Sequence, residues 1–400
     1  MPLQSHRVPA RTQRAMAGAA LLSRIAKGGF LVSIVLAAIA LSSQRLRYIH
    51  AYFVASGFLT TIGLGALFFV LLHHLLKARW SVIASRQMQW VATVLPWCVL
   101  LFLPNLLWAR EIFPWMAAGA TTNLPETDKI GYLRAPWFFA RAAAYWAIWT
   151  WLSWWYTGPK SQLEGSPESE RHIERCRRFS GPALLLFAIT TTFASFDWFM
   201  SLQPNWHSAI FGVYIFAGAV PSALAMLALF TVLLERLGVV RATYNVATRH
   251  DIAKLLFGFI MFWAYIAFSQ YLLIWYAGIS LETSFYRLRF NNDWLPTTLW
   301  LFALQFVVPF AALLSASAKR SSLVLFAVSL VVVLAHALDI FWLVMPALES
   351  GHPRLCFADF AAATLPVSAL LLLLAKGIES ESQMPQQTHR TSNLEPLQSL

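Results

Sequence analysis

Residues 322–345 read SLVLFAVSLVVVLAHALDIFWLVM, and residues 181–199 read GPALLLFAITTTFASFDWF. A single helix of this length can cross the hydrocarbon core of a bilayer, which is about 30 Å thick. The whole chain agrees, because 58% of its 400 residues are hydrophobic and only 12% are charged, whereas soluble domains carry roughly 25% charged residues. The sequence therefore predicts an all-α, polytopic membrane protein and excludes a water-soluble globule.

Apolar windows of about 20 residues predict ten membrane-spanning helices, at residues 20–42, 51–76, 90–108, 136–157, 180–201, 206–234, 252–277, 294–317, 321–345 and 357–376. The ten-helix membrane domain thus covers residues 20–376, between a basic N-terminus of residues 1–19 and a tail of residues 377–400. The tail is rich in Ser, Gln, Thr and Pro, so we expect it to be disordered. The inner loop 158–179 carries Glu and Arg at helical spacing and indicates a short solvated helix.

The basic residues predict the orientation of the chain. Of its 30 Lys and Arg residues, 21 fall in segments that share a side with the two termini, eight fall on the opposite side, and Arg141 lies inside the fourth helix. Segments rich in Lys and Arg stay in the cytoplasm, so both termini are predicted to be cytoplasmic. The net charge of +12 is then mainly a topology signal, and we expect no nucleic-acid partner.

The ligands for tightly held redox centres are absent from the sequence. Its three Cys residues form neither a C-x-x-C pair nor a C-x-x-C-H haem attachment sequence, so neither an iron–sulfur cluster nor c-type haem is expected. A b-type haem needs two His at matched depth, but His73 and His74 lie at the inner end of the second helix and His336 lies in the outer half of the ninth. His250 could at best face His73. No metal site, covalently bound cofactor or catalytic residue is predicted.

Ionisable side chains at bilayer depth are the candidates for function, because each costs at least about 2.5 kcal/mol to insert and usually faces the bundle interior. His336 and Asp339 share a helical face and could form a pair that passes a proton or contacts a quinone, or a pair that only satisfies itself. Asp197 could bond only the backbone near a helix end, and Arg141 could be either a counter-ion or an interfacial anchor. The candidate proton path or quinone site comprises Asp197, Gln270, His336, Asp339 and Arg141, entered from the cytoplasm near His73, His74 and Glu235.

Two long blocks carry a resemblance to a known family. Residues 191–225 read TTFASFDWFMSLQPNWHSAIFGVYIFAGAVPSALA, and residues 254–287 read KLLFGFIMFWAYIAFSQYLLIWYAGISLETSFYR. Shorter matches are GALFFVLLHHLLKARWSV at 65–82 and HALDIFWLVMP at 336–346. Over residues 45–346 the chain resembles the second NrfD-like membrane subunit of alternative complex III, a bacterial quinol:cytochrome c oxidoreductase. That subunit belongs to the polysulfide-reductase membrane-subunit superfamily.

The resemblance implies two four-helix bundles, built from the second to fifth and the sixth to ninth helices, in the bacterial inner membrane. It implies a quinone-binding subunit, with menaquinone or ubiquinone as ligand, and a proton path coupled to quinol oxidation. The implied partners are a homologous quinol-binding membrane subunit, an iron–sulfur subunit and haem c subunits. The first helix and the loop 111–135 match the family poorly.

Two other function classes stay open. A purely structural membrane anchor for the cytochrome and iron–sulfur subunits would need no quinone or proton chemistry, since likeness of fold does not establish a site. A secondary transporter usually has helices broken at corresponding places in two repeats. Pro96, Pro221 and Pro309 interrupt helices without repeating, which disfavours a transporter.

Overall fold

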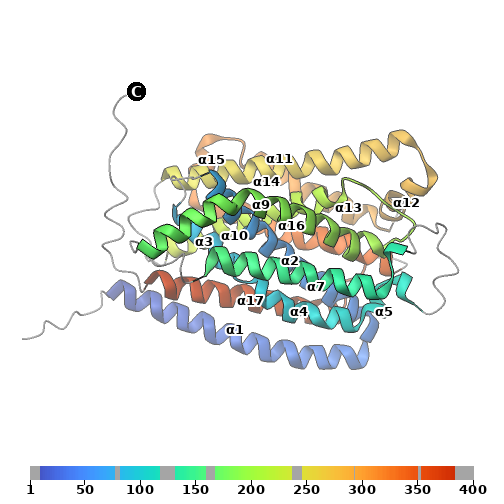
Figure 1. The fold of residues 1–400 in the computed structure, drawn as a ribbon, viewed down its shortest axis with the longest axis horizontal. Helices are drawn as coiled ribbons and strands as arrows, with labels where there is room; N and C mark the ends of the chain where they lie inside the picture. Colours follow the sequence, from blue (N-terminus) through green and yellow to red (C-terminus); the bar gives the residue numbers. More distant parts are fainter. Residues whose placement is uncertain are drawn as a thin grey trace, which may run out of the picture.

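The computed structural model describes residues 10–76, 82–117, 131–158, 167–236, 246–291, 293–349 and 353–382. Helices and short connections account for all of these residues, and no strand occurs among them. The long helices lie side by side along the longest axis of the molecule (Figure 1). The all-α prediction is confirmed.

Each of the ten predicted spans coincides with helical structure. Long helices are α1 (Ala10–Ser43), α2 (Arg45–Leu76), α3 (Val82–Ala92) with α4 (Leu95–Leu107), α7 (Ala135–Thr157), α9 (Pro167–Trp198), α10 (Phe211–Arg236), α11 (Val246–Ala277), α16 (Ser322–Leu348) and α17 (Phe357–Ser382). Shorter elements are α5 (Ala109–Ile112), η1 (Pro114–Met116), η3 (Met200–Leu202), α12 (Ser280–Arg289), α13 (Leu295–Phe302), η4 (Ala303–Val307), α14 (Val308–Ala312) and α15 (Ala316–Arg320).

Nine helical stretches of the described residues are long and apolar enough to cross a membrane. The tenth predicted span is α7, whose 23 residues extend about 34 Å but include Arg141 and many Trp and Tyr side chains. Figure 1 shows the start of α1 and the end of α17 at the same end of the molecule, as an even number of crossings requires. We call this the inner end and the opposite one the outer end, following the predicted orientation.

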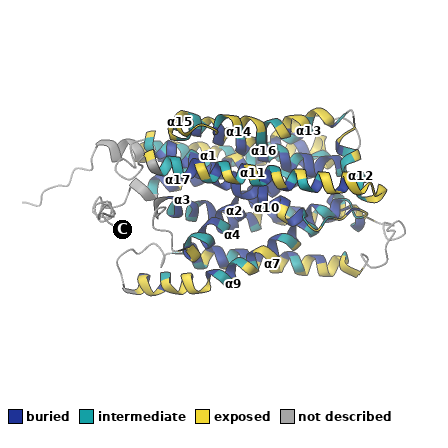
Figure 2. Ribbon diagram, turned by 90° about the horizontal axis from the view of Figure 1, so that it is seen from above, coloured by how far each residue is buried: buried dark blue, intermediate teal, exposed yellow. Residues whose placement is uncertain are grey.

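The helices group into two bundles and a flanking pair. In the first bundle α2, α3 with α4, α7 and α9 pack together, and in the second α10 packs with α11 and α16, against which α13 to α15 lie. The bundles meet where α2 contacts α10 and α16, and the pair α1 and α17 packs beside α2. The central helices α2 and α10 are therefore buried along most of their length (Figure 2). Helix α1, at the edge of the molecule, is largely exposed.

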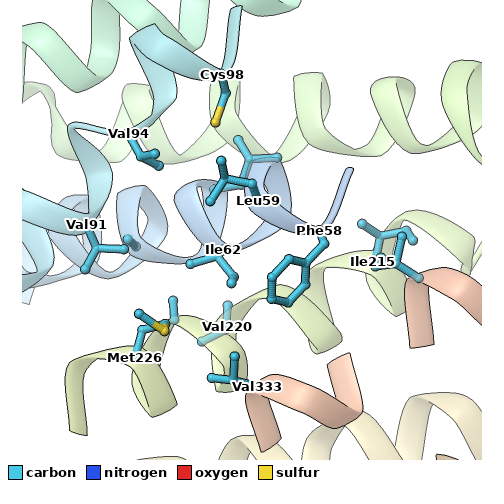
Figure 3. Packing of buried hydrophobic residues seen from close by; sticks show 14 of the residues in the cluster. Phe58, Leu59, Ile62, Val91, Val94, Cys98, Ile215, Val220, Met226 and Val333 are labelled. Carbon is cyan, nitrogen blue, oxygen red and sulfur yellow. The ribbon is translucent and has the colours of Figure 1, made fainter. Parts of the chain in front are cut away.

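The seam between α2 and α10 is closed by small residues. A Cβ at Gly65 of α2 would lie 2.2 Å from the carbonyl oxygen of Ala219 on α10, so only glycine permits this approach of the two backbones. Around the seam, Ile62 of α2 lies near Val220 of α10 and Val333 of α16, and all three are buried (Figure 3). This seam fixes how the two bundles face each other.

Several boundaries differ from the prediction. The expected solvated helix in the inner loop is the first part of α9, which runs without a break into the fifth span. The eighth span contains a π-helical turn, η4, which ends two residues before Pro309 of α14; proline has no N–H for the carbonyl of Gln305. In the predicted disordered tail, α17 continues to Ser382, and residues 383–400 lie outside the described residues, as do residues 1–9.

Candidate functional site

Asp339 is the centre of a buried polar cluster in the second bundle. The Tyr214 hydroxyl of α10 donates a 2.5 Å hydrogen bond to Asp339 Oδ1, and Trp263 Nε1 of α11 donates a 3.3 Å bond to Oδ2. No Lys or Arg of the described residues forms an ion pair with this carboxyl group. A buried carboxylate is costly without a counter-charge, so a carboxyl group held only by neutral donors is suited to carry an exchangeable proton.

His336 lies one helical turn from Asp339 and links it to the first bundle. Its Nε2 lies 2.8 Å from Thr61 Oγ1 of α2. Because the Thr61 hydroxyl already donates to the carbonyl of Phe58, it accepts from Nε2–H, which leaves Nδ1 of the neutral ring without a proton. Nδ1 lies 3.9 Å from Asp339 Oδ2, so the two side chains face each other as predicted, but at a distance too long for a hydrogen bond.

Asp197 forms a second cluster in the first bundle, near the outer end of α9. Arg141 of α7 donates two hydrogen bonds of 2.8 Å, from Nε and Nη2, to the two carboxylate oxygens of Asp197. The Tyr145 hydroxyl adds a bond of 2.7 Å, and the guanidinium lies over the ring of Tyr132 at 3.9 Å. Of the two interpretations of Arg141, the structure supports the counter-ion, and Asp197 bonds far more than the backbone.

The two clusters are separated by a cavity of about 10 Å³, which is room for about one water molecule. Thr61 of the Asp339 cluster lines it, and so does Trp198, the residue that follows Asp197. Apolar atoms form the accessible wall of this cavity. The described residues therefore do not join the two clusters by a continuous chain of hydrogen bonds.

An open pocket of about 420 Å³ adjoins the Asp197 cluster at the outer end. Its wall includes Tyr132 and Ser201, and the Ser201 hydroxyl donates a 2.5 Å bond to the backbone carbonyl of Asp197. Trp206 and His207 lie in the same wall. Aromatic walls with few polar groups are typical of sites that hold a flat organic ring.

The predicted cytoplasmic entry residues gather at the inner end. His73 and His74 lie near the end of α2, with ring centroids 6.0 Å apart, and Glu235 accepts a 2.5 Å bond from Arg249. His74 follows Thr61 by 13 residues along α2, which is about 20 Å along the helix. The entry residues are therefore not in contact with the Asp339 cluster.

Two buried glutamines in the second bundle have unsatisfied amide groups. Gln270 of α11 has a side-chain oxygen without a partner among the described residues. Gln305, on the π-helical turn η4, is fully buried and both of its side-chain polar atoms lack such a partner. Because an unpaired buried polar group costs about 1–3 kcal/mol, these amides are places where a water or a ligand hydroxyl would be stabilised.

The sequence alone did not point to several members of the clusters. Tyr214, Trp263 and Thr61 come from three different helices, and aromatic or hydroxyl residues are too common in this chain to mark a site. Tyr145 carried a usable signal, because it follows Arg141 by four residues and so shares its helical face.

The wider comparisons add no relative. No protein-family model matches the sequence, and no curated protein matches it. Among the described residues, no group of three or more His, Cys, Asp or Glu side chains could hold a metal ion. The two clusters and the pocket beside them are therefore the features from which a function can be inferred.

Proposed function

We propose that the chain is the quinone-interacting membrane subunit of a bacterial quinol:cytochrome c oxidoreductase of the alternative complex III type, and that it contributes a proton path. The observation that supports this most is the environment of Asp339, a carboxyl group at bilayer depth with neutral donors only and with the free Nδ1 of His336 facing it. Burying an ionisable carboxyl group at this depth costs free energy, and a role in proton exchange would explain why the chain retains it.

The proton step follows from the tautomer of His336. When Asp339 Oδ2 gives its proton to Nδ1, the ring becomes an imidazolium. Its Nε2 proton can then move to Thr61 Oγ1 as the Thr61 hydroxyl turns away from the Phe58 carbonyl and releases its own proton to a water molecule in the adjoining cavity. The 3.9 Å gap has to close by a small rotation of either side chain or by a water molecule. Beyond Thr61, a water held by Thr61 and by the Thr191 hydroxyl, which lines the cavity without a partner among the described residues, would extend the path toward the Asp197 cluster.

A quinone would occupy the open pocket beside Asp197. Its ring fits between aromatic walls, and His207 is placed to accept a proton from a quinol hydroxyl. Oxidation of the quinol releases two protons and two electrons. The electrons would pass to iron–sulfur and haem subunits, because the sequence has neither a C-x-x-C pair nor a C-x-x-C-H motif.

The test uses the intact complex, purified from native membranes and reconstituted in vesicles with a menaquinol or ubiquinol analogue and cytochrome c. Asp339→Asn keeps the shape of the side chain and removes its exchangeable proton. Loss of proton release with quinol oxidation retained supports the path. Loss of both would mean that quinol reacts at Asp339 and not in the pocket beside Asp197. Unchanged behaviour on both counts refutes a role for Asp339; the control is Asp251→Asn, whose carboxylate pairs with Lys254 at the inner end.

A purely structural anchor is the second candidate. The fully satisfied pair of Arg141 and Asp197 favours it, because such a pair can hold α7 against α9 without any chemistry. If the complex containing Asp339→Asn and His207→Gln variants assembles, oxidises quinol and releases protons as the wild type does, the anchor is the correct function.

A further inference from the structure

A large pocket of about 590 Å³ lies at the outer end of the first bundle, next to the pocket beside Asp197, with which it shares Leu133. Its wall is formed by the end of α4, by α5 with η1, and by the start of α7. One part of the wall is basic and the other is apolar. The proposed quinone and proton chemistry does not involve this pocket.

The basic part of the wall carries two arginines. Arg110 and Arg134 line the pocket, both are exposed, and neither forms an ion pair with a described residue. The nearest acid in sequence, Glu111, is already bonded to Arg45 over 2.6 Å. Two cations thus face the pocket without a counter-charge from the described part of the chain.

The start of α7 adds to this positive field. Arg134 is the residue before the helix, and no side chain caps the first turn, so backbone N–H groups there lack a helical partner. The N-terminal end of a 23-residue helix carries a partial positive charge that favours an anion. The anion-binding features and the two arginines therefore meet at one pocket.

The apolar part of the wall continues into the membrane-spanning surface. Leu107 and Phe139 line the pocket, and Leu100, Leu103 and Leu107 are exposed along one stripe of α4, at spacings of three and four residues that share a helical face. A small free anion would not need this surface, whereas an acyl chain would lie along it.

We infer that this pocket binds an anionic phospholipid of the outer leaflet. Arg110, Arg134 and the start of α7 hold its phosphodiester group, and an acyl chain follows the leucine stripe of α4. The ligand chemistry is a phosphate ester joined to an apolar chain. This site is independent of the proposed quinone and proton function.

The experiment measures lipid binding to the purified protein by native mass spectrometry, with phosphatidylglycerol and phosphatidylcholine titrated separately. We expect tighter binding of phosphatidylglycerol, and a loss of about tenfold or more in its affinity in an Arg110→Gln/Arg134→Gln variant, because both cations that attract the charged headgroup are removed. The control is Arg287→Gln, which removes an exposed arginine on α12, outside the pocket.

Three results would overturn the inference. Equal binding of both lipids that the double variant does not change means an adventitious lipid only. Displacement of phosphatidylglycerol by millimolar inorganic phosphate or glycerophosphate means that a free anion is the ligand. A photo-reactive side chain at Leu107 is expected to capture phospholipid in native membranes, and capture of a polypeptide instead would mean that a protein partner covers this surface. Because both arginines are exposed, we expect the double variant to fold as the wild type does. Thermal unfolding, compared with that of Arg287→Gln, detects any misfolding.

Discussion

Gly218 of α10 lies directly against the imidazole of His336 on α16: a Cβ at this glycine would lie 3.1 Å from Cε1 of the ring and 3.2 Å from Asp339 Oδ2. The absence of a side chain at Gly218 is what makes room for the His336 and Asp339 pair between two closely packed helices.

Gly218→Ala is expected to disturb the pair without unfolding the protein. The added methyl group forces His336 or Asp339 to move by a few tenths of an ångström, and overpacking of this kind costs about 1–3 kcal/mol. The matched control is Gly258→Ala on α11, where a Cβ meets nothing within 4 Å and alanine favours the helix by up to about 1 kcal/mol. Thermal unfolding in detergent compares the two variants; equal stability would contradict the tight contact.

Arg141→Gln is expected to destabilise the protein by about 3–5 kcal/mol, because it leaves the buried carboxylate of Asp197 without its counter-charge. Asp197→Asn should then lower stability much less in an Arg141→Gln background than in the wild type. A double-mutant cycle in detergent unfolding measures this coupling. Additive effects of the two substitutions would show that the two bonds of 2.8 Å contribute no net stability.

Arg289 of α12 is expected to stabilise α16 where Pro346 removes a backbone hydrogen bond. Pro346 has no N–H, so the carbonyl of Trp342 lacks its helical partner, and Arg289 Nε fills this place at 3.1 Å while Nη2 bonds the carbonyl of Leu343 at 2.7 Å. The guanidinium is buried over the ring of Phe285 at 3.6 Å, and although burial lowers the pKa of Arg289 to about 9, the group stays protonated at neutral pH.

Arg289→Gln should therefore cost about 1–3 kcal/mol, the usual effect of leaving a buried carbonyl unsatisfied. In a Pro346→Ala background the helix supplies the missing N–H itself, and the same substitution should cost less. Unfolding of the four proteins tests this. If Arg289→Gln destabilised the Pro346→Ala protein as much as the wild type, Arg289 would act through its other contacts, such as that with the ring of Phe285.

Glu349, just beyond the end of α16, is expected to make stability depend on acid pH. Burial by itself would raise the pKa of this carboxyl group, but the hydrogen bond with His50 and the charge of Arg47 outweigh it, so the pKa lies below its usual range. A lowered pKa in the folded state stabilises the protein above the unfolded-state value of about 4.3, and the contribution is lost as the pH falls through the folded-state value.

The measurement is the thermal midpoint of the wild type and of Glu349→Gln between neutral pH and pH 3. The wild type should be more stable at neutral pH, and the difference should shrink below about pH 4.3. A difference that stays constant over this range would show that Glu349 contributes through packing alone.

The sequence by itself determined the class of fold and the positions of the spans. Insertion of a segment such as residues 322–345 depends on the apolar content of that segment, so a window along the chain detects it without knowledge of its neighbours. The same local cost marked His336, Asp339 and Asp197 as exceptional. The predicted helix boundaries were wrong where features other than apolar content determine the structure. In α9 the charged first part continues the helix beyond the apolar span, and in η4 the backbone forms a π-helical turn.

Only the tertiary structure decided what these polar residues do. Asp339 is bonded by Tyr214 and Trp263, which lie 125 and 76 residues away in the sequence, and Asp197 by Arg141, 56 residues away. No pattern within a helix encodes such pairings, because they depend on the rotation and depth of each helix against the next. The rotation and depth of each helix depend on the packing of small residues such as Gly65 and Gly218. A small residue has this effect only where two helices are in contact, so a single helix considered alone does not reveal it.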